Sequence, residues 1–318
     1  MLQFTIALLS WAMSNAALAE YPEAPIRLII PFASGSATDT SARIYATALS
    51  KQLGQQVVPD NRPGAGGAIG LELLARAAPN GYIIAYAGAG PLAINRSVSE
   101  KLPYDVEKDF APISQAIDAP LIMAASPTLP VKTVKDVIAL ARARPGQLSN
   151  GSSGTGTIGY LAGELFKLMT NTQIVHIPYK GGAQAAIDVI AGHVQLIFDP
   201  INGVSPFVRS GKLRGLAVTG ARRVGSFPDL PTVAESGVAG YEITTWGGLI
   251  APVRLPQAIV ARLSQEMRTA AASQFVKDSY VPLGAEPRAS TPEEFAALIR
   301  RETAKWADVV KRTEANAK

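Results

Sequence analysis

Small polar residues gather where an apolar run ends near the start of the chain. Residues 26–30 form an almost unbroken aliphatic run, which is typical of a strand buried on both faces of a parallel sheet. Pro31 ends the run, and Phe32-Ala33-Ser34-Gly35 leads into a segment with apolar residues every three or four positions, as on one face of a helix. Such a junction leaves unpaired N–H groups beside the positive end of the helix dipole, and therefore predicts an anion-binding site.

Ser36 and Asp39 stand three residues apart at the start of this predicted helix, as a capping pair would. If the Asp39 carboxylate bonds back to the helix start, it repels a bound anion less than its charge suggests. Both residues therefore stay candidates for the site.

Similar loops recur along the chain between predicted strands and helices. They all contain glycine, and they cover residues 61–67, 87–91, 150–157 and 178–182. Three of them follow short apolar runs, at 56–59, 82–86 and 174–177, and helices are predicted at 68–77, from 158 onward and at 183–190.

This βα repetition predicts the α/β class, with two doubly wound units of parallel strands whose ligand lies beyond the strand carboxyl ends, in a central cleft. Residues 110–117 and 121–125 read as two separate strands that link the units, and 194–198 and 213–219 as two more. From residue 251 the chain is mostly helical, at 257–272 and 293–313. We expect the chain to cross back near 245–248 so that these last helices cover the first unit. Closure of one unit on the other would bury the ligand.

Three other chemistries have some support in the residues. Residues 154–159 match the dinucleotide pattern G-x-G-x-x-G, but no Asp or Glu stands near His176, where a ribose contact would be required. Neither Ser34 nor Ser153 lies in a G-x-S-x-G elbow, and the only possible bases are His176 and His193, so a hydrolase is the weaker alternative. Two histidines on separate elements also make a zinc site improbable, and no cofactor or metal is expected.

Two charged positions keep open interpretations. Asp199 ends an apolar run, and it either accepts a hydrogen bond from the solute or caps a turn at Asn202-Gly203. Lys180 and Arg62 either contact a carboxylate or are solvated at the rim.

Composition excludes several classes of protein. The chain has 318 residues, 47% of them hydrophobic and 17% charged, which is typical of one very large or two ordinary globular domains. The absence of cysteine excludes disulfides, thiolate metal sites and a cysteine nucleophile. The net charge of +5 comes from Lys and Arg scattered among acids, without a basic run or interleaved aromatics, so nucleic-acid binding is not expected.

The first nineteen residues resemble a secretory signal peptide. An apolar run at 4–13 is followed by small residues that end in Ala17-Leu18-Ala19, although Met1-Leu2-Gln3 lack a basic residue. The alternative is an uncleaved anchor, but the apolar run is short for a span of about 20 residues.

A series of motifs in this chain resembles the extracytoplasmic solute-binding receptors of tripartite tricarboxylate transporters, the Bug receptors. In chain order they are YPEAPIRLIIPFASGSATD, DNRPGAGGAIG, PNGY, GSSGTGTIGYLAGELF, HIPYKGGAQAAIDVIAGHV, GKLRGLAVTGARR, FPDLPTVAESGVAGYE, WGGLIAP and TPEEF. The resemblance covers essentially all of the chain after the predicted signal.

The resemblance implies a periplasmic receptor with the type II binding-protein fold, which captures a small carboxylate between two lobes and hands it to membrane permease subunits. A monomer is expected, and the alternative function is a secreted hydrolase or nucleotide-dependent enzyme on a similar scaffold. We expect a signal peptide at 1–19, lobe 1 at 20–118 plus 246–318, and lobe 2 at 119–245. Two positions depart from the family pattern, because Ser36 stands where a glycine is common and Tyr160 where a histidine is common, so a bulkier or aromatic carboxylate is conceivable.

The expected ligand contacts lie in loops of both lobes. In lobe 1 they are Phe32, Ser34, Gly35, Ser36, Ala37, Thr38, Asp39, Gly64, Ala65, Gly66, Gly88, Ala89 and Gly90, within stretches that extend to Gly67 and Pro91. In lobe 2 they are Ser152, Ser153, Gly154, Thr155, Gly156, Thr157, Tyr160, Tyr179, Lys180, Gly181 and Asp199.

Overall fold

The computed structural model describes residues 21–99 and 101–315, and the side chains of this part up to residue 311. The predicted signal peptide at 1–19 lies outside the described residues. Within them, no helix combines the length and the apolar character that crossing a bilayer requires.

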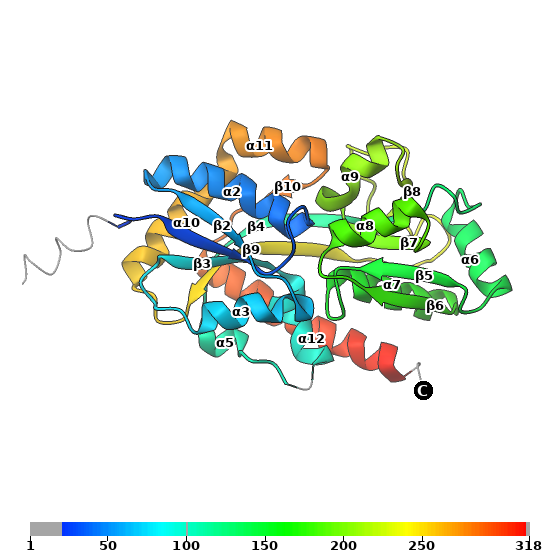
Figure 1. Cartoon of the computed structure of the whole chain (residues 1–318), viewed down its shortest axis with the longest axis horizontal. Helices are drawn as coiled ribbons and strands as arrows, with labels where there is room; N and C mark the ends of the chain where they lie inside the picture. Colours follow the sequence, from blue (N-terminus) through cyan, green and yellow to red (C-terminus); the bar gives the residue numbers. More distant parts are fainter. Residues whose placement is uncertain (1–20, 100, 316–318) are drawn as a thin grey trace, which may run out of the picture.

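The strands of the described chain form one continuous mixed sheet with the order β2-β1-β3-β9-β4-β7-β5-β6, and β8 and β10 both pair with β4 (Figure 1). Their bounds are β1 Ile26–Ile30, β2 Val57–Asn61, β3 Ile83–Gly88, β4 Phe110–Ala125, β5 Leu148–Ser152, β6 Ile174–Pro178, β7 Leu196–Pro200, β8 Arg214–Val218, β9 Thr244–Pro252 and β10 Glu286–Pro287.

The two ends of this sheet are parallel, as the repeated βα pattern predicts. At one end β1 pairs in parallel with β2 and β3, and at the other β5 pairs in parallel with β6 and β7. Between them, β9 runs antiparallel to β3 and β4, and β4 runs antiparallel to β7. The α/β class with two doubly wound units is confirmed, whereas the expectation of parallel strands alone is wrong for the middle of the sheet.

Strand β4 corrects the prediction of two strands at 110–117 and 121–125. It is one strand of 16 residues whose first part pairs with β9, whose last five residues pair with β7, and whose last four also pair with β8. The register shifts between Pro112 and Ser114 and between Gln115 and Ile117, and such bulges allow a strand that contains Pro112 and Pro120 to continue as an irregular ladder. The strand thereby links both halves of the molecule.

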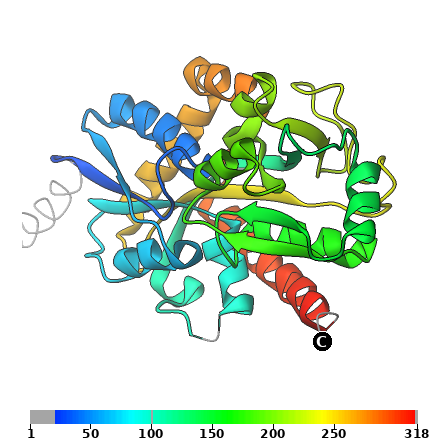
Figure 2. The same ribbon diagram turned by 45° about the vertical axis from the view of Figure 1, so that its right-hand side comes forward.

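Helices cover both faces of the sheet (Figures 1 and 2). Their bounds are α2 Ala37–Leu53, η1 Ala65–Gly67, α3 Ala68–Ala75, η2 Gly90–Ile94, α4 Asn95–Val98, α5 Val106–Asp109, α6 Val134–Ala143, α7 Ile158–Thr170, α8 Gly182–Ala191, α9 Ile201–Arg209, α10 Gln257–Ala272, α11 Gln274–Tyr280, η3 Val281–Leu283 and α12 Pro292–Ala315.

The aliphatic run of β1 shows why the sheet needs two helical layers. Leu28 and Ile30 are fully buried in a cluster with Tyr45 of α2, whereas Ile29 between them is buried in a second cluster with Leu71 of α3. Because successive strand residues point to opposite faces, an uninterrupted apolar strand requires cover on both.

The C-terminal helices pack on the half of the sheet that contains β1, β3 and β9. The Phe295 ring of α12 packs edge-on against Trp246 of β9, with 5.8 Å between centroids, and Leu263 of α10 lies in the same cluster as Tyr45. The expected crossing near 245–248 lies in β9. The lobe boundaries at 118/119 and 245/246 fall inside β4 and β9 and stay a prediction.

Candidate ligand-binding cleft

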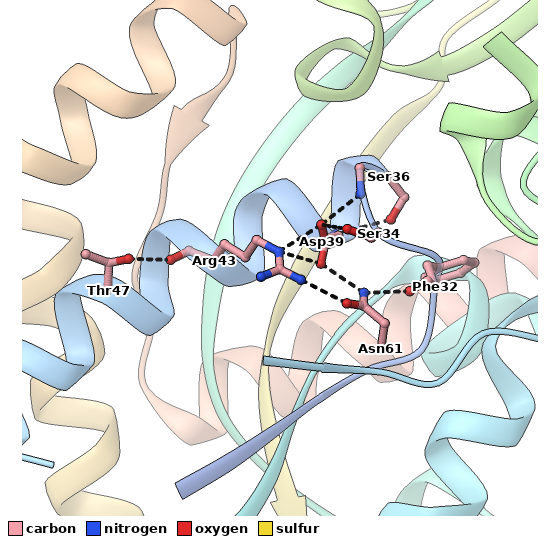
Figure 3. A network of polar contacts seen from close by, with 8 residues as sticks. Phe32, Ser34, Ser36, Asp39, Arg43, Thr47 and Asn61 are labelled. Carbon is pink, nitrogen blue, oxygen red and sulfur yellow. Dashed lines mark hydrogen bonds and ion pairs between the residues drawn. The ribbon is translucent and has the colours of Figure 1, made fainter. Parts of the chain in front are cut away.

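A network of polar contacts around Asp39 fixes the loop between β1 and α2 (Figure 3). The Asp39 carboxylate accepts hydrogen bonds from the Gly35 N–H at 2.8 Å, from Asn61 Nδ2 at 2.9 Å and from Arg43 Nε at 2.9 Å. Asn61 Nδ2 also donates to the Phe32 carbonyl at 2.9 Å. The loop is therefore tied to β2 and to the body of α2 before any ligand enters.

The predicted capping pair is confirmed, with one difference. Ser36 Oγ accepts a hydrogen bond from the Asp39 N–H at 3.2 Å, but the Asp39 carboxylate bonds to the N–H of Gly35 rather than to that of Ser36. Burial by itself raises the pKa of Asp39, but the hydrogen bonds from Arg43, Asn61 and Gly35 outweigh burial and lower it below its usual range. Asp39 is thus an ionised group that positions the loop.

The second loop has an unusual backbone. Gly64, Ala65, Gly66 and Gly67 have φ angles of 133°, 47°, 60° and 95° in succession. Positive φ is rare for a residue with a Cβ such as Ala65, and the Gly67 N–H closes the turn by donating to the Gly64 carbonyl at 2.9 Å. The loop then leads into α3, whose N-terminus adds its dipole.

The third predicted loop is shorter than expected. Gly88 still belongs to β3, and Gly90 begins the single π-helical turn η2. A Cβ on Gly90 would lie 3.1 Å from the Gly156 carbonyl, so this turn closely approaches the β5–α7 loop. Asn95, at the end of the turn, donates to the Gly66 carbonyl at 3.1 Å and thereby links the second and third loops.

Ser152 and His176 support the opposite wall of the cleft. Ser152 Oγ and His176 Nε2 are 2.7 Å apart, and the His176 ring packs on Tyr160 with 4.7 Å between centroids. Burial, and to a smaller extent the charge of Lys167, lowers the pKa of His176 to about 4. The imidazole is therefore neutral at neutral pH. Ser152 has no exposed surface, so this Ser–His pair is structural and offers no accessible nucleophile.

Thr157 and Tyr179 hold the loops of this wall. Thr157 Oγ1 donates to the Gly154 carbonyl at 2.7 Å and accepts from the Tyr160 N–H, which caps α7. The Tyr179 hydroxyl donates to Asp188 of α8 at 2.5 Å. Lys180, next to it, has an exposed side chain.

The two walls meet across a cleft of about 660 Å³. A Cβ on Gly66 would lie 2.6 Å from the Thr155 carbonyl of the other wall, and one on Gly181 would lie 3.1 Å from Ala33 Cβ. The cleft is lined by Phe32, Gly64, Ala65, Gly66, Gly67, Ser99, Ser153, Gly154, Thr155, Pro178, Tyr179, Lys180 and Gln184.

A smaller cavity of about 50 Å³ shares Phe32 and Ser153 with this cleft. Its other lining residues are Ser36, Ala37, Thr38, Gly88, Ala89, Gly90, Pro91, Thr157, Ile158, Gly159, Asp199, Pro200 and Thr245. It lies beside the turn η2 and where α2 and α7 begin, so the positive ends of these two helices converge on it.

Asp199 is a buried carboxyl group in this inner cavity, with 2% of its surface exposed. The described residues give it one hydrogen bond, a long one of 3.4 Å from Ser153 Oγ to Oδ1. Burial, only partly offset by Ser153, raises its pKa to about 7. The interpretation of Asp199 as the cap of an Asn202-Gly203 turn is wrong, because both residues lie inside α9 and that helix has no side-chain cap.

Most of the expected contact residues line one of these two cavities, but seven do not. Ser34, Gly35, Asp39, Ser152, Gly156, Tyr160 and Gly181 lie beside or behind the lining. Asp39, Ser152 and Tyr160 instead support the loops through the contacts described above. Arg62 pairs with Asp60 at 3.0 Å and is likewise outside the lining.

Sequence reasoning missed several lining residues, namely Ser99, Ile158, Gly159, Pro178, Gln184, Pro200 and Thr245. Gln184 could have been found, because it is in the first turn of a predicted helix that follows a glycine loop. Thr245 gave no such signal, since it reaches the cavity only through the place of β9 beside β3 and β4.

The dinucleotide and metal interpretations gain no support. A Cβ on Gly159 would lie 2.3 Å from the Phe198 carbonyl, and one on Gly156 would lie 2.3 Å from Asn95 Oδ1, so close packing explains these glycines. Among the described residues, no group of three or more His, Asp or Glu side chains is placed to hold a metal ion.

Comparison with known proteins agrees with this geometry. Residues 41–315 match the model of the tripartite tricarboxylate transporter family receptor. The chain is 36% identical to the protein BugT of Bordetella pertussis over 299 residues. This aligned region covers 94% of this chain and 92% of BugT.

Two solved structures are similar over nearly their whole length. One is an R. palustris protein with adipate, at 36% identity and a TM-score of 0.91, covering 92% of this chain and 98% of that one. The other is MatC from Rhodopseudomonas palustris with bound malate, at 28% identity and a TM-score of 0.88, covering 91% of this chain and 100% of that one.

Proposed function

This chain belongs to the tripartite tricarboxylate transporter receptor family, and from that premise we propose that its cleft binds a small organic carboxylate for delivery to membrane permease subunits. The chain is a solute-binding receptor of this family, and the enzyme alternative is not favoured. The carboxylate, the permease partner, a monomeric state and a periplasmic location after export are the parts that we propose.

The observation that carries the proposal is the meeting of two glycine-containing loops across one cleft. Gly66 on one wall lies so close to the Thr155 carbonyl on the other that a Cβ would be 2.6 Å from it. Around this contact the starts of α2, α3, α7 and α8 supply helix N-termini, which favour a negative ligand.

The nature of the ligand follows from the lining and from the relatives. Backbone N–H groups and the hydroxyls of Ser36, Thr38 and Ser153 can satisfy a carboxylate, and Lys180 adds a cation at the outer cleft. Two relatives are solved with adipate and malate, both small carboxylates. We propose a ligand whose leading carboxylate enters the inner cavity and whose remainder occupies the larger cleft.

Thermal-shift screening tests this function. Purified mature protein is heated with a panel of mono- and dicarboxylates that includes adipate and malate, and with nucleotides as the contrasting class. A ligand at one hundred times its Kd should stabilise the protein by about 2.7 kcal/mol. Stabilisation by nucleotides alone, or conversion of a bound compound to product, would contradict the proposal.

A further inference from the structure

Asp199 presents a carboxyl group that the fold leaves almost without partners. Within residues 21–99 and 101–315, no hydrogen bond to its Oδ2 is present, and the only bond to Oδ1 is the long one from Ser153. A buried carboxylate normally accepts several hydrogen bonds or pairs with a cation. This group is therefore available to a ligand.

The glycines around Asp199 show that the space beside it is built into the sequence. A Cβ on Gly182, at the start of α8, would lie 2.4 Å from Oδ1, and one on Gly203 in α9 would lie 2.6 Å from Oδ2. Any larger residue at either position would press on the carboxyl group. Asp199 thus sits between two helices with its carboxyl group in the inner cavity.

No described charged group offsets the charge of Asp199. The charged groups and the histidine on the elements packed against it are Asp39, Arg43 and Lys51 of α2, Glu164 and Lys167 of α7, Lys180 before α8, Asp188 of α8, Arg209 of α9, Asp118 of β4 and His176 beside the β5–α7 loop. Glu164 and Lys167 pair with each other. Asp39 and Arg43 pair with each other, Asp188 accepts from Tyr179, and Arg209 bonds to the carbonyls of Pro282 and Ser226. The pKa of Asp199 responds to burial and Ser153 and to none of these charges.

An anionic ligand changes the protonation of such a group. Two carboxylates that share a small site cannot both stay ionised, because like charges at hydrogen-bond distance in a low-dielectric cavity raise one pKa strongly. A protonated carboxyl, by contrast, is a hydrogen-bond donor as well as an acceptor.

We propose that Asp199 is protonated in the complex and donates a hydrogen bond to the carboxylate of the solute, so that the receptor takes up one proton with each anion. The proton comes from solvent and joins the Asp199 carboxylate, and the ligand stays ionised. This inference rests on the carboxylate receptor function proposed above and adds a pH dependence to it.

Isothermal titration calorimetry from pH 6 to pH 9 tests the inference with adipate and malate as probes. At pH 7 and above both probes are fully ionised, so their own protonation does not contribute. At pH 8, titrations in HEPES and in Tris, which differ in ionisation enthalpy, count the protons taken up. We expect a count approaching one, and a Kd that rises about tenfold per pH unit above 7.

The variant Asp199→Asn separates the donor role from an acceptor role. Its amide donates a hydrogen bond at every pH, so the variant should show no proton uptake and should bind at least tenfold more tightly than wild type at pH 9. Asp229→Asn, at an exposed carboxylate outside both cavities, is the matched control and should keep the wild-type pH profile.

Each other outcome has a distinct meaning. Binding of a probe with no proton uptake, or Asp199→Asn binding a hundredfold more weakly at all pH values, would overturn the inference and leave the receptor function standing. The second result would make Asp199 an acceptor for a hydroxyl or ammonium group. Failure of both probes and of every other carboxylate in the panel to bind at any pH would overturn the proposed function and this inference together.

Discussion

The two walls of the cleft use different chemistry to hold similar loops. The β1–α2 loop is fixed by a charged network in which the Asp39 carboxylate meets Arg43, Asn61 and the Gly35 N–H (Figure 3). The β5–α7 loop is held by neutral groups, such as the Ser152–His176 pair, and its neighbouring carboxyl, Asp199, is almost unpartnered.

This difference separates positioning from recognition. Asp39 is satisfied by the protein, so its charge is already neutralised and its pKa is low whether or not a ligand is present. Asp199 keeps its hydrogen-bonding capacity for the inner cavity and has a raised pKa. We infer that the first wall is preorganised and that the second wall responds to the solute. Four predictions test this comparison.

The largest effect is expected at the charged network. Asp39→Ala leaves Arg43 and Asn61 without their shared acceptor and should lower the free energy of unfolding by about 3 kcal/mol. This value is at the low end for breaking a buried ion pair, because the Arg43 side chain is half exposed. Since the pKa of Asp39 is lowered on folding, its contribution should be present above about pH 4 and disappear as the pH falls through the folded-state pKa.

Urea unfolding at several pH values measures this contribution. Asp60→Asn is the control, because the Asp60 side chain is 22% exposed against 4% for Asp39, so its pairs with Arg27 and Arg62 should contribute less than about 1 kcal/mol. Equal losses in both variants would mean that the Asp39 network has no special role.

The approach of the two walls is tested by Gly66→Ala. The new Cβ would lie 2.6 Å from the Thr155 carbonyl, so the walls must separate, and carboxylate affinity should fall about a hundredfold, or about 2.7 kcal/mol. Gly54→Ala is a close control: its φ of 69° resembles the 60° of Gly66, but its Cβ would meet no atom within 4 Å. Calorimetry should find affinity unchanged in the control, and a similar loss in both variants would argue that backbone strain alone is responsible.

The responsive wall is tested by the stability of Asp199→Asn without ligand. An acid whose pKa is raised on folding binds more protons in the folded state, so wild-type stability should fall as the pH rises from about 4 to about 7. The variant lacks this loss and should be about 2 kcal/mol more stable than wild type at pH 8. This difference in stability is about half of the value that a pKa near 7 would give by itself. We expect the smaller value because the N-termini of α2 and α8 favour the charged form of Asp199.

Chemical denaturation at pH 4, 6 and 8 provides the comparison. The advantage of the variant should grow from pH 4 to pH 8. A constant difference between the two proteins across this range would show that Asp199 titrates as an ordinary exposed carboxyl.

The smallest effect is expected at a contact between α9 and α2. Asn202 Nδ2 donates to the Ala37 carbonyl at 2.8 Å and to Ser41 Oγ at 3.0 Å, and so joins the second half of the chain to the helix that begins beside the cleft. Asn202→Ala should weaken carboxylate binding by about fivefold, or about 1 kcal/mol. Ser41→Ala removes one of the two bonds and should cost less, and an equal or larger loss in Ser41→Ala would contradict this ranking.

Much of the fold could be predicted because its signals are local. The buried run of β1, the cap at Ser36 and the helix at 257–272 depend on neighbouring residues, and the structure places them close to the predicted bounds. Strand β4 and helix α9 could not be predicted in this way. A gap is predicted between the strands at 110–117 and 121–125 although β9 and β7 together keep β4 continuous, and Asn202-Gly203 reads as a turn although it lies in a helix.

The sequence by itself determined that glycine loops follow apolar strands, that they begin helices, and that such junctions attract anions. Only the tertiary structure decided which side chains face the ligand. Asp39 and Asp199 are both acids near glycine-containing segments, yet Arg43 neutralises the first and Asn61 donates a hydrogen bond to it, whereas no described cation meets the second. The physical reason is that a loop conformation depends on residues a few positions apart, whereas the partners of a buried charge come from segments that only folding brings together.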